Sequence, residues 1–468
     1  MVRNSKAIPI ETRISRLLPY LAAVIILAYH AFFTWRGLAM YFDNDDMMNL
    51  YEAWRRPWPE VLQALAMFWS DFYRPAGALF YRTVFAAAGF DPLPFRIACM
   101  VVTTANLGLF CWLARMVLPT GRAVAVAALL FAFHSRVMEI WFRTATIYDI
   151  LCFSFFYLAV CVYVRARRGG RTPSALEAAG IVVCAVLALD SKEVAVALPV
   201  VLAAWELLFA KFDWRRWWLI GVLAMMNVPF ILGKQSLKAE YKPEYSWARF
   251  SGNWGGYWNH LLLGPETGGN PMLAVGILVG LLAVGLGLRS APLVWSWVVL
   301  FSTVLPVIFV DQRGAYVLYL AMPGLAIYAA TFIEMLQDRI LVFRPAWRQQ
   351  LACVVFVLLG WRYGKAMLHD QRIDKVKNWL NESPGQVRTL AASLRSLQPK
   401  MKSGARVLIL EDPFPATEWT PTFVAGLLYN DSTIWVDRPK KMPAAPPNWL
   451  NYDVVITWQD GKYRQLKP

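Results

Sequence analysis

The sequence has little charge, few histidines and no cysteine in its polar segments. Only 17% of its 468 residues are charged, where soluble domains have about a quarter, and 58% are hydrophobic. All six cysteines lie in apolar runs, and none is spaced as metal ligands or a disulfide framework would be. The sequence therefore argues against a disulfide-rich secreted domain and a zinc site, and we expect the cysteines to be small buried hydrophobic residues.

Long apolar runs take the place of the missing charge and predict an α-helical polytopic membrane protein. A spanning helix needs roughly 20 apolar residues, and about eleven runs approach that length. The predicted spans lie near 17–35, 95–117, 122–135, 145–164, 175–189, 194–210, 216–233, 258–288, 291–310, 315–333 and 346–363. Only the second part of 258–288 is expected to cross.

The net charge of +16 is not evenly distributed. Basic residues fall in alternate connections, such as "RARRGGR" at 165–171 and "KFDWRR" at 211–216, and acids fall in the opposite set. Because Lys and Arg in short loops usually mark the cytoplasmic side, we expect a cytoplasmic N-terminus in the cell (inner) membrane. This distribution indicates orientation rather than a nucleic-acid partner.

A change of composition near residue 364 predicts two domains. Residues 1–363 form the membrane domain, with a large first external loop at 36–94, and 364–468 form a small α/β domain. "RVLILEDP", "STIWVD" and "YDVVITWQDGKYRQL" are expected strands, the last with Asp460-Gly461 in a hairpin turn. With an odd number of spans this domain is extracytoplasmic. It has no Gly-rich phosphate loop, so we expect an accessory role.

The densest acidic stretch, "YFDNDDMMNLYEAW" at 41–54, opens the first external loop. Helical spacing places Met47, Leu50, Tyr51 and Trp54 on one face, which predicts an interfacial helix resting on the bilayer with carboxylates above it. The alternative is a solvated loop start. Clustered acids at a membrane boundary are costly unless paired or used, so we favour a functional site.

Further polar residues lie at the same predicted face of the membrane. Glu139 follows the third span and is able to pair with Arg136 or Arg143 at helical spacing. Lys192 and Glu193 occupy a turn between apolar helices, either as a hydrophilic hairpin tip or as a phosphate-binding point charge. In the same class are Arg74 before Pro75, and Arg313 with Tyr316 in "QRGAYVLYL".

The order of these motifs, "DNDD", "YRP", "SKE" and "QRGAYVLYL", resembles the GT-C superfamily of integral-membrane glycosyltransferases. The resemblance covers about residues 15–335 and is closest to the protein O-mannosyltransferase-like branch and its bacterial relatives. It implies inverting transfer from a polyprenyl-phosphate sugar on the outer side, with a first-loop acid activating the acceptor.

By this resemblance the base is Asp45 or Asp46, with Asp43 as the alternate. Lys192 and Arg313, with Arg74, would bind the lipid phosphate. Glu139, Glu193 and Tyr316 complete the predicted substrate-binding set. No metal ligands are predicted, although three close carboxylates would permit a bridging divalent cation such as Mg²⁺ or Mn²⁺.

The expected partners are the polyprenyl-phosphate sugar donor, membrane lipids and an acceptor that is a protein, lipid or glycan. Two other functions stay open at this point. A polysaccharide polymerase or ligase would use the same chemistry, and a lipid-linked glycan flippase or transporter would also need intramembrane charges and broken helices. The sequence shows no convincing internal repeat, and its acids gather at one face, which favours a transferase.

Overall fold

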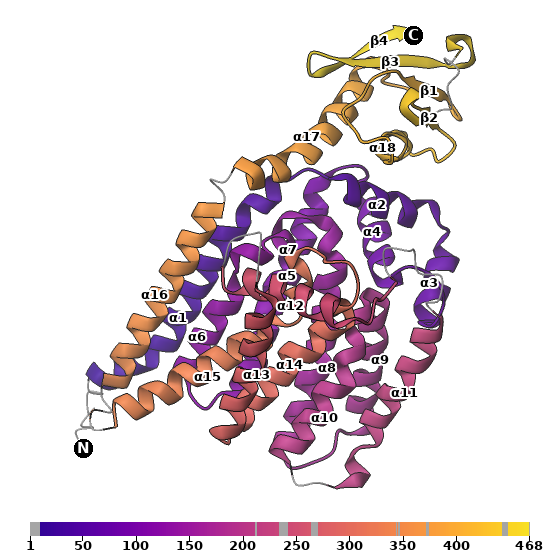
Figure 1. Cartoon of the computed structure of the whole chain (residues 1–468). Coiled ribbons are helices and arrows are strands. Elements are labelled where there is room, and N and C mark those ends of the chain that lie inside the picture. Colours follow the sequence, from indigo (N-terminus) through magenta and orange to yellow (C-terminus); the bar gives the residue numbers. More distant parts are fainter. Residues whose placement is uncertain are drawn as a thin grey trace, which may run out of the picture.

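The computed structural model describes residues 10–210, 213–233, 242–263, 270–342, 344, 347–370, 374–441 and 448–467. The structure is mostly helical, with a small sheet near the C-terminus. Figure 1 shows a helical body, with the C-terminal domain attached to one end of it through α17 (Asp374–Leu397).

The body contains long helices joined by short 3₁₀ turns. Its α-helices are α1 (Ile10–Thr34), α2 (Asn44–Arg55), α3 (Trp58–Ala66), α4 (Pro75–Ala88), α5 (Pro92–Val117), α6 (Gly121–Ala132), α7 (Glu139–Phe142), α8 (Ile147–Arg168), α9 (Ala175–Ser191), α10 (Leu198–Phe209), α11 (Trp218–Gly233), α12 (Trp247–Leu261), α13 (Pro271–Gly287), α14 (Ala291–Ile308), α15 (Met322–Ile340) and α16 (Trp347–Asp370). The turns that border the candidate site are η1 (Trp35–Ala39), η2 (Ser135–Val137), η3 (Thr144–Thr146), η4 (Glu193–Ala197) and η7 (Ala315–Leu318).

Local sequence explains where many of these helices begin. Asp91, Thr120, Ser174 and Asn270 precede α5, α6, α9 and α13, and each side chain accepts a hydrogen bond from the first turn. Proline stands near the start of α4, α5 and α13, where its missing N–H has no helical partner to lose.

Five helical segments are long and apolar enough to cross a membrane, among the residues that the structure describes. They are Leu18–Ala39, Pro92–Val117, Thr144–Arg168, Ala291–Ile308 and Trp347–His369. The predicted count of eleven is not confirmed. Helices α6 and α10 have 12 residues each, or about 18 Å at 1.5 Å per residue, less than the roughly 30 Å hydrocarbon thickness. The predicted span 258–288 holds only the end of α12, and then α13.

The first external loop folds into three helices, as its length predicts, but α2 does not rest on a bilayer. Met47, Leu50 and Tyr51 share one buried face, which packs on α4 and on the C-terminal domain instead of on lipid. The prediction of an interfacial helix was therefore wrong about what covers its apolar face. Arg82 of α4 donates to the carbonyls of Ala53 and Trp54 at the end of α2 and fixes the two helices together.

The C-terminal domain has the predicted α/β structure. Its elements are α17, β1 (Arg406–Ile409), α18 (Thr420–Tyr429), β2 (Trp435–Asp437), β3 (Val454–Gln459) and β4 (Lys462–Lys467). The sheet order is β2-β1-β3-β4, with β1 parallel to both neighbours and β3–β4 an antiparallel hairpin. Asp460 and Gly461 form its turn with φ of 51° and 76°, which suits the left-handed hairpin turn predicted for Asp-Gly.

A buried arginine organises the loop that precedes α18. The Arg438 guanidinium pairs with the Asp412 carboxylate at 2.7 Å and donates to the Phe414 carbonyl at 2.7 Å and the Glu418 carbonyl at 2.5 Å. A planar guanidinium with five donors matches several acceptors at once. The loop from 412 to 418 is therefore held in one conformation, and it carries Glu418 toward the helical body.

The C-terminal domain docks directly on α2. The rings of Tyr51 and Phe423 lie 4.8 Å apart, and the Trp54 Nε1 donates to the Asn430 side chain at 3.1 Å. A Cβ on Gly426 would come within 2.8 Å of the Tyr51 ring, so this contact needs glycine. Figure 1 shows α18 facing α2, while the start of α1 lies at the other end of the body.

Candidate functional site

The acids of α2 begin with a capping arrangement. Asp43 is the N-cap residue, and its carboxylate accepts from the Asp46 N–H at 2.9 Å. The Asp46 carboxylate in turn accepts from the Asp43 N–H at 3.1 Å. This reciprocal capping box satisfies two N–H groups that a helix start leaves without partners. Asp43 and Asp46 thus stabilise the start of the helix.

Asp46 lies wholly inside the protein. Its carboxylate accepts from the Ala145 N–H at 2.5 Å and lies 3.8 Å from the Arg96 guanidinium. Burial, reinforced by the nearby Asp43 charge, raises the pKa of Asp46. An acid so enclosed cannot meet an acceptor molecule, whereas the Asp45 side chain is 58% exposed. Of the paired acids predicted as the base, the geometry favours Asp45.

Arg143 draws three carboxylates into one group. It contacts the Asp43 carboxylate, the Asp45 carboxylate at 2.8 Å and the Glu139 carboxylate at 3.2 Å. Burial raises the pKa of both Asp45 and Glu139, and Arg143 opposes the shift in each. The predicted pairing of Glu139 with a nearby arginine is confirmed for Arg143. Arg143, which the sequence predicted only as a partner of Glu139, lies at the centre of the group.

A second charged group lies between α8, α9 and α4. Lys192 forms a buried ion pair with Asp149, and its ammonium lies 4.8 Å from the centre of the Tyr316 ring. Arg74 pairs with both carboxylate oxygens of Glu193, at 3.2 and 2.9 Å. Although burial acts to raise it, pairing with Arg74 holds the pKa of Glu193 below its usual value. Lys192 and Arg74 are therefore both paired with acids, and a phosphate would have to compete with these carboxylates for them.

Arg74 is held in an unusual backbone conformation. Its φ is 50°, in the left-handed region, and it precedes Pro75 at the start of α4. A non-glycine residue in this conformation costs of order 1–3 kcal/mol and persists where surrounding contacts enforce it. The guanidinium lies 4.5 Å from the Tyr73 ring centre and 5.1 Å from that of Tyr148. These contacts and Glu193 hold the strained residue in place.

The loop before η7 joins the two charged groups. A Cβ on Gly314 would lie 2.7 Å from the Glu139 carboxylate and 2.8 Å from the Tyr316 ring. The glycine therefore lets the backbone pass between these side chains. The Arg313 N–H donates to the Tyr257 hydroxyl at 3.4 Å, which ties the same loop to α12. The motif "QRGAY" thus lies against both groups.

The C-terminal domain also borders the acids. Burial raises the pKa of Glu418, while a hydrogen bond with the Asn44 side chain opposes the shift, and Asp45 is among the charges that act on it. The Asn44 N–H donates to the Ser383 hydroxyl of α17 at 3.3 Å. The predicted accessory domain therefore supplies a carboxylate beside the candidate base.

The structure brings the predicted site residues into one connected region. The set comprises Asp43, Asp45, Asp46, Arg74, Glu139, Lys192, Glu193, Arg313 and Tyr316, and their individual roles stay predictions. Sequence reasoning missed Arg96, which is buried in an apolar helix, and Glu418, which lies far away in the chain. The signal that could have identified Arg96 is a single arginine within a long apolar run. No signal in the sequence pointed to Glu418.

The fit of a divalent cation to these acids is poor. Across the described ranges, no group of three His, Cys, Asp or Glu side chains is arranged to hold a metal ion. Arg143 occupies the position between Asp43 and Asp45 that a bridging cation would need, and Asp46 is directed to backbone N–H groups. No chemical step through a metal is derived from these residues.

No family model matches the chain, and no curated protein matches it either. The resemblance to the GT-C superfamily therefore stays a prediction from the motifs. The case for a function rests on the charged groups around Arg143 and Tyr316.

Proposed function

We propose that the chain is a membrane glycosyltransferase that moves a sugar from a polyprenyl phosphate to an acceptor, with inversion. The observation that carries the proposal is the position of Asp45. Its side chain is 58% exposed and open to an acceptor, while the protein atoms around it partly desolvate the carboxylate and raise its pKa. It lies at the edge of a region in which carboxylates gather on one side and Arg74 and Lys192 lie on the other. Acids with raised pKa values beside opposite charges are typical of catalytic sites.

In the proposed reaction, Asp45 takes the proton of the acceptor hydroxyl as its oxygen attacks the anomeric carbon. A new C–O bond forms on the face opposite the phosphate, and the old bond breaks with its electron pair leaving on the polyprenyl phosphate. A positioned base contributes about 10²–10⁴-fold. Arg143 donates to the carboxylates of both Asp45 and Glu139 and so fixes the position of the base.

Cations on the other side of the region support the leaving phosphate in this proposal. Arg74 presents a two-pronged guanidinium to Glu193, and Lys192 lies beside Tyr316. The donor phosphodiester offers the same paired oxygens and the same single charge as a carboxylate, so it can replace Glu193 at Arg74. The phosphate that leaves gains a second charge, which the cations stabilise more strongly. Arg313 lies on the adjoining loop. The donor is thus expected to loosen the Arg74–Glu193 pair when it binds.

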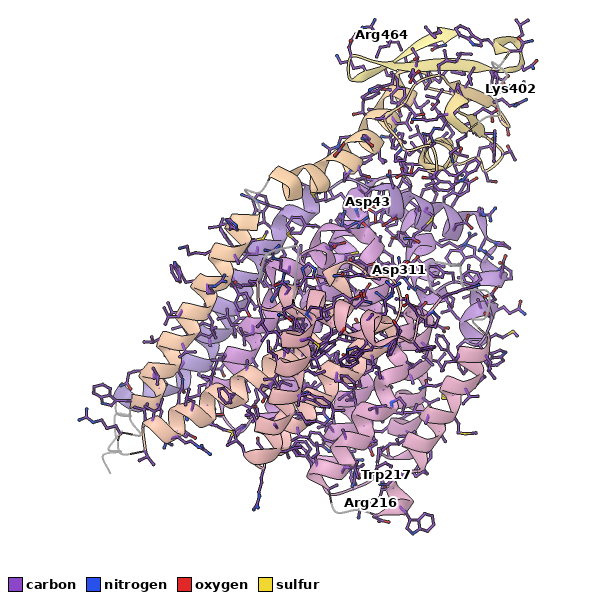
Figure 2. All side chains as sticks on the ribbon, viewed as in Figure 1. Asp43, Arg216, Trp217, Asp311, Lys402 and Arg464 are labelled. Carbon is purple, nitrogen blue, oxygen red and sulfur yellow. The ribbon has the colours of Figure 1, made fainter. Side chains whose placement is uncertain are left out.

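The proposal includes an orientation in the cell (inner) membrane. We place an odd number of crossings, a cytoplasmic N-terminus and an extracytoplasmic C-terminal domain in it, with the five long apolar helices among the crossings. Figure 2 supports this arrangement, since Asp43 lies near the C-terminal domain and Arg216 lies at the far end of the body. Basic residues usually mark the cytoplasmic end. The hydroxyl acceptor would then be a protein, lipid or glycan outside the cytoplasm.

A flippase or transporter of lipid-linked glycans is the second candidate. A separate observation favours it: Arg167 and Glu206 form an ion pair between α8 and α10 with both side chains 2% exposed. Buried charges between helices are common in transport pathways. A flippase would move the donor without breaking its sugar–phosphate bond. A polymerase or ligase would break that bond and differs from our proposal only in using a glycan acceptor.

Comparing Asp45→Asn with Glu52→Gln tests the proposal. Both acids lie on α2, but among the described residues Glu52 pairs with its neighbour Arg55, at 3.1 Å, and not with Arg143. We expect Asp45→Asn to lower sugar transfer from a polyprenyl-phosphate sugar in liposomes by about 10²–10⁴-fold, with donor binding unchanged. Glu52→Gln should keep full transfer.

Full transfer by Asp45→Asn would end the catalytic assignment of this residue. Movement of the donor across the liposome membrane, with its sugar–phosphate bond intact and no transfer in the wild type, would favour the flippase instead. Thermal melting of each variant in detergent separates loss of the base from loss of the fold.

A further inference from the structure

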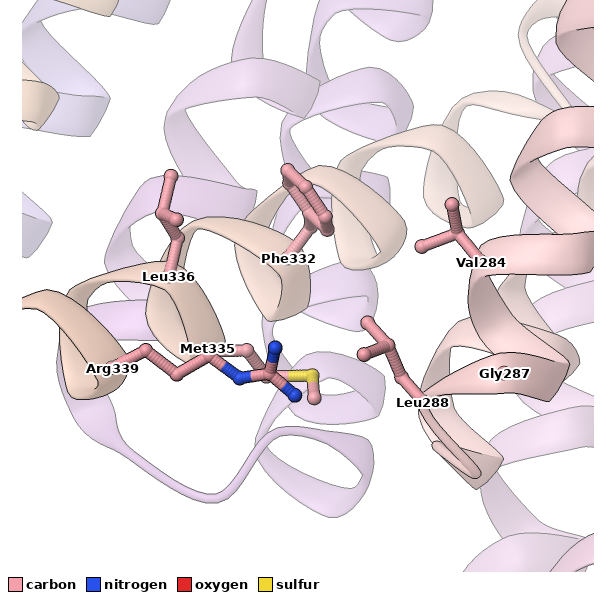
Figure 3. A pocket seen from close by; sticks show the side chains of 7 residues that line it. All are labelled: Val284, Gly287, Leu288, Phe332, Met335, Leu336 and Arg339. Carbon is pink, nitrogen blue, oxygen red and sulfur yellow. The ribbon is translucent and has the colours of Figure 1, made fainter.

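A groove lies between α13 and α15, far from the acids of α2. It encloses about 330 Å³ and is lined by Val284, Gly287, Leu288, Phe332, Met335, Leu336 and Arg339. Figure 3 shows the Arg339 guanidinium reaching past Met335 toward Leu288, with Phe332 and Val284 above it. All but one of the lining residues are apolar or glycine.

The walls of this groove belong to an apolar surface of the body. Phe332 is 40% exposed and Leu336 is 48% exposed. Farther along α13, Leu273 and Val279 are also largely exposed. A contiguous apolar surface of this kind is stable in contact with acyl chains rather than water. An acyl chain is therefore the natural occupant of the groove.

Arg339 distinguishes the groove from an ordinary lipid-facing surface. Within the described part of the chain, its side chain forms no ion pair or hydrogen bond. Its neighbour Asp338 instead pairs with Arg122 at 3.3 Å and Arg348 at 3.2 Å. Arg289, the residue after Leu288, likewise has no ion pair with a described residue. The Arg339 guanidinium therefore lines the groove, and Arg289 directly follows a lining residue, both without a described carboxylate partner.

We propose that the groove binds an anionic phospholipid, with an acyl chain between α13 and α15 and the headgroup phosphate on Arg339. A phosphate bound by a guanidinium is a charge-assisted, two-pronged contact. The second positive charge, on Arg289, favours a lipid with net negative charge over a zwitterionic one. The site lies at the end of the body away from the C-terminal domain, so it is separate from the proposed donor site (Figure 1).

The test is lipid binding by the full chain in detergent, followed by native mass spectrometry. Phosphatidylglycerol and phosphatidylcholine with the same acyl chains are the probes. We expect the wild type to retain phosphatidylglycerol preferentially, and Arg339→Gln to lose affinity roughly ten- to a hundredfold. Arg344→Gln is the matched control, because Arg344 stacks on Trp347 at 5.2 Å and does not line the groove.

A second pair of variants tests the apolar part of the groove. A Cβ at Gly287 or at Gly221 would meet no atom within 4 Å, so neither site resists a larger side chain locally. Gly287→Leu would fill the groove and should reduce phosphatidylglycerol retention. Gly221→Leu, on α11 and outside the groove lining, should leave retention unchanged.

Several results would overturn the proposal. They are equal retention of both lipids by the wild type, equal losses in Arg339→Gln and Arg344→Gln, or release of the lipid by inorganic phosphate alone. Preferential retention of a polyprenyl phosphate by the groove would also overturn it, because the occupant would then be the sugar carrier. None of these measurements depends on sugar transfer.

Discussion

Arg143 and Arg438 each gather oxygen atoms, but in opposite surroundings. Arg143 is shared by three carboxylates, and that of Asp45 is 58% exposed. The Arg438 side chain is 1% exposed and meets one carboxylate, on Asp412, which is 0% exposed, with backbone carbonyls taking its remaining donors. The closed group, around Arg438, also includes Lys440, which pairs with Asp412 at 2.8 Å, so it has more base than acid, and it organises a loop. The open group, around Arg143, has three carboxylates to one guanidinium, and we expect catalysis there.

The largest effect is expected at the closed group. Arg438→Met would leave the buried Asp412 carboxylate with the partly exposed Lys440 as its remaining cation, at 2.8 Å, and would remove the contacts of the guanidinium with the Phe414 and Glu418 carbonyls. Breaking a buried pair typically costs about 3–5 kcal/mol, and Lys440 reduces that cost here. The C-terminal domain should then melt earlier and become sensitive to protease near residues 411–419. Thermal melting and limited proteolysis in detergent measure both changes.

A double variant sharpens this prediction. Arg438→Met with Asp412→Leu removes the buried pair and leaves Lys440, whose side chain is 32% exposed, to the solvent. Apolar replacements of buried pairs are often neutral or stabilising. Most of the lost stability should return. If the single variant were as stable as the wild type, Arg438 would not organise the loop.

At the open group, removing the arginine should change pH dependence more than folding. Burial raises the pKa of Asp45 and Arg143 opposes that shift, so Arg143→Gln should raise the pKa further. Since a base must be deprotonated, transfer is lost as pH falls through this pKa. The acidic limb of the transfer–pH profile should therefore move to higher pH. An unmoved limb would mean that the base does not lie beside Arg143.

The burial of Asp46 should make the stability of the protein depend on pH. The folded chain holds the Asp46 proton more tightly than the unfolded chain, because burial raises its pKa. Its contribution to stability is therefore greatest at low pH and declines as pH rises from the ordinary aspartate range through the raised value. Asp46→Asn does not titrate, so its melting temperature should fall less between about pH 4 and 8. Parallel melting curves for the two proteins would contradict this.

The smallest effect is expected for an exposed pair on the same helix. Glu52 and Arg55 are 43% and 50% exposed, and such pairs contribute at most about 1 kcal/mol. Glu52→Gln should leave both melting and transfer nearly unchanged. A large loss of transfer would show that an acid on any face of α2 affects activity. The difference between the groups around Arg143 and Arg438 would then not explain which acids are catalytic.

Local patterns in the sequence predicted the elements whose causes are local. The stretch around "VVITW" and the Asp460-Gly461 turn predicted β3 and β4, and helical spacing predicted the apolar face of α2. The partner of that face was missed, because Phe423 lies near the other end of the chain. Hydropathy alone cannot separate a spanning helix from a shorter buried one, and α10 is such a case.

The candidate site shows the same division. The motifs marked Asp45 and Lys192 as unusual because charge is rare in this chain. The pairing of Arg143 with Asp45, 98 residues apart, and of Lys192 with Asp149, 43 residues apart, depends on helix packing that no local spacing encodes. The sequence therefore could not predict which cations are already paired with carboxylates.

The contact between α2 and the C-terminal domain has a consequence for synthesis. Trp54 emerges from the ribosome 376 residues before its partner Asn430, or roughly 20–75 s earlier at usual elongation rates of about 5–20 residues per second. During that interval the early helices exist without the cover that Phe423 and Glu418 provide. The acid cluster is completed only when the last domain folds onto it, so a nascent or prematurely terminated chain carries an unfinished site.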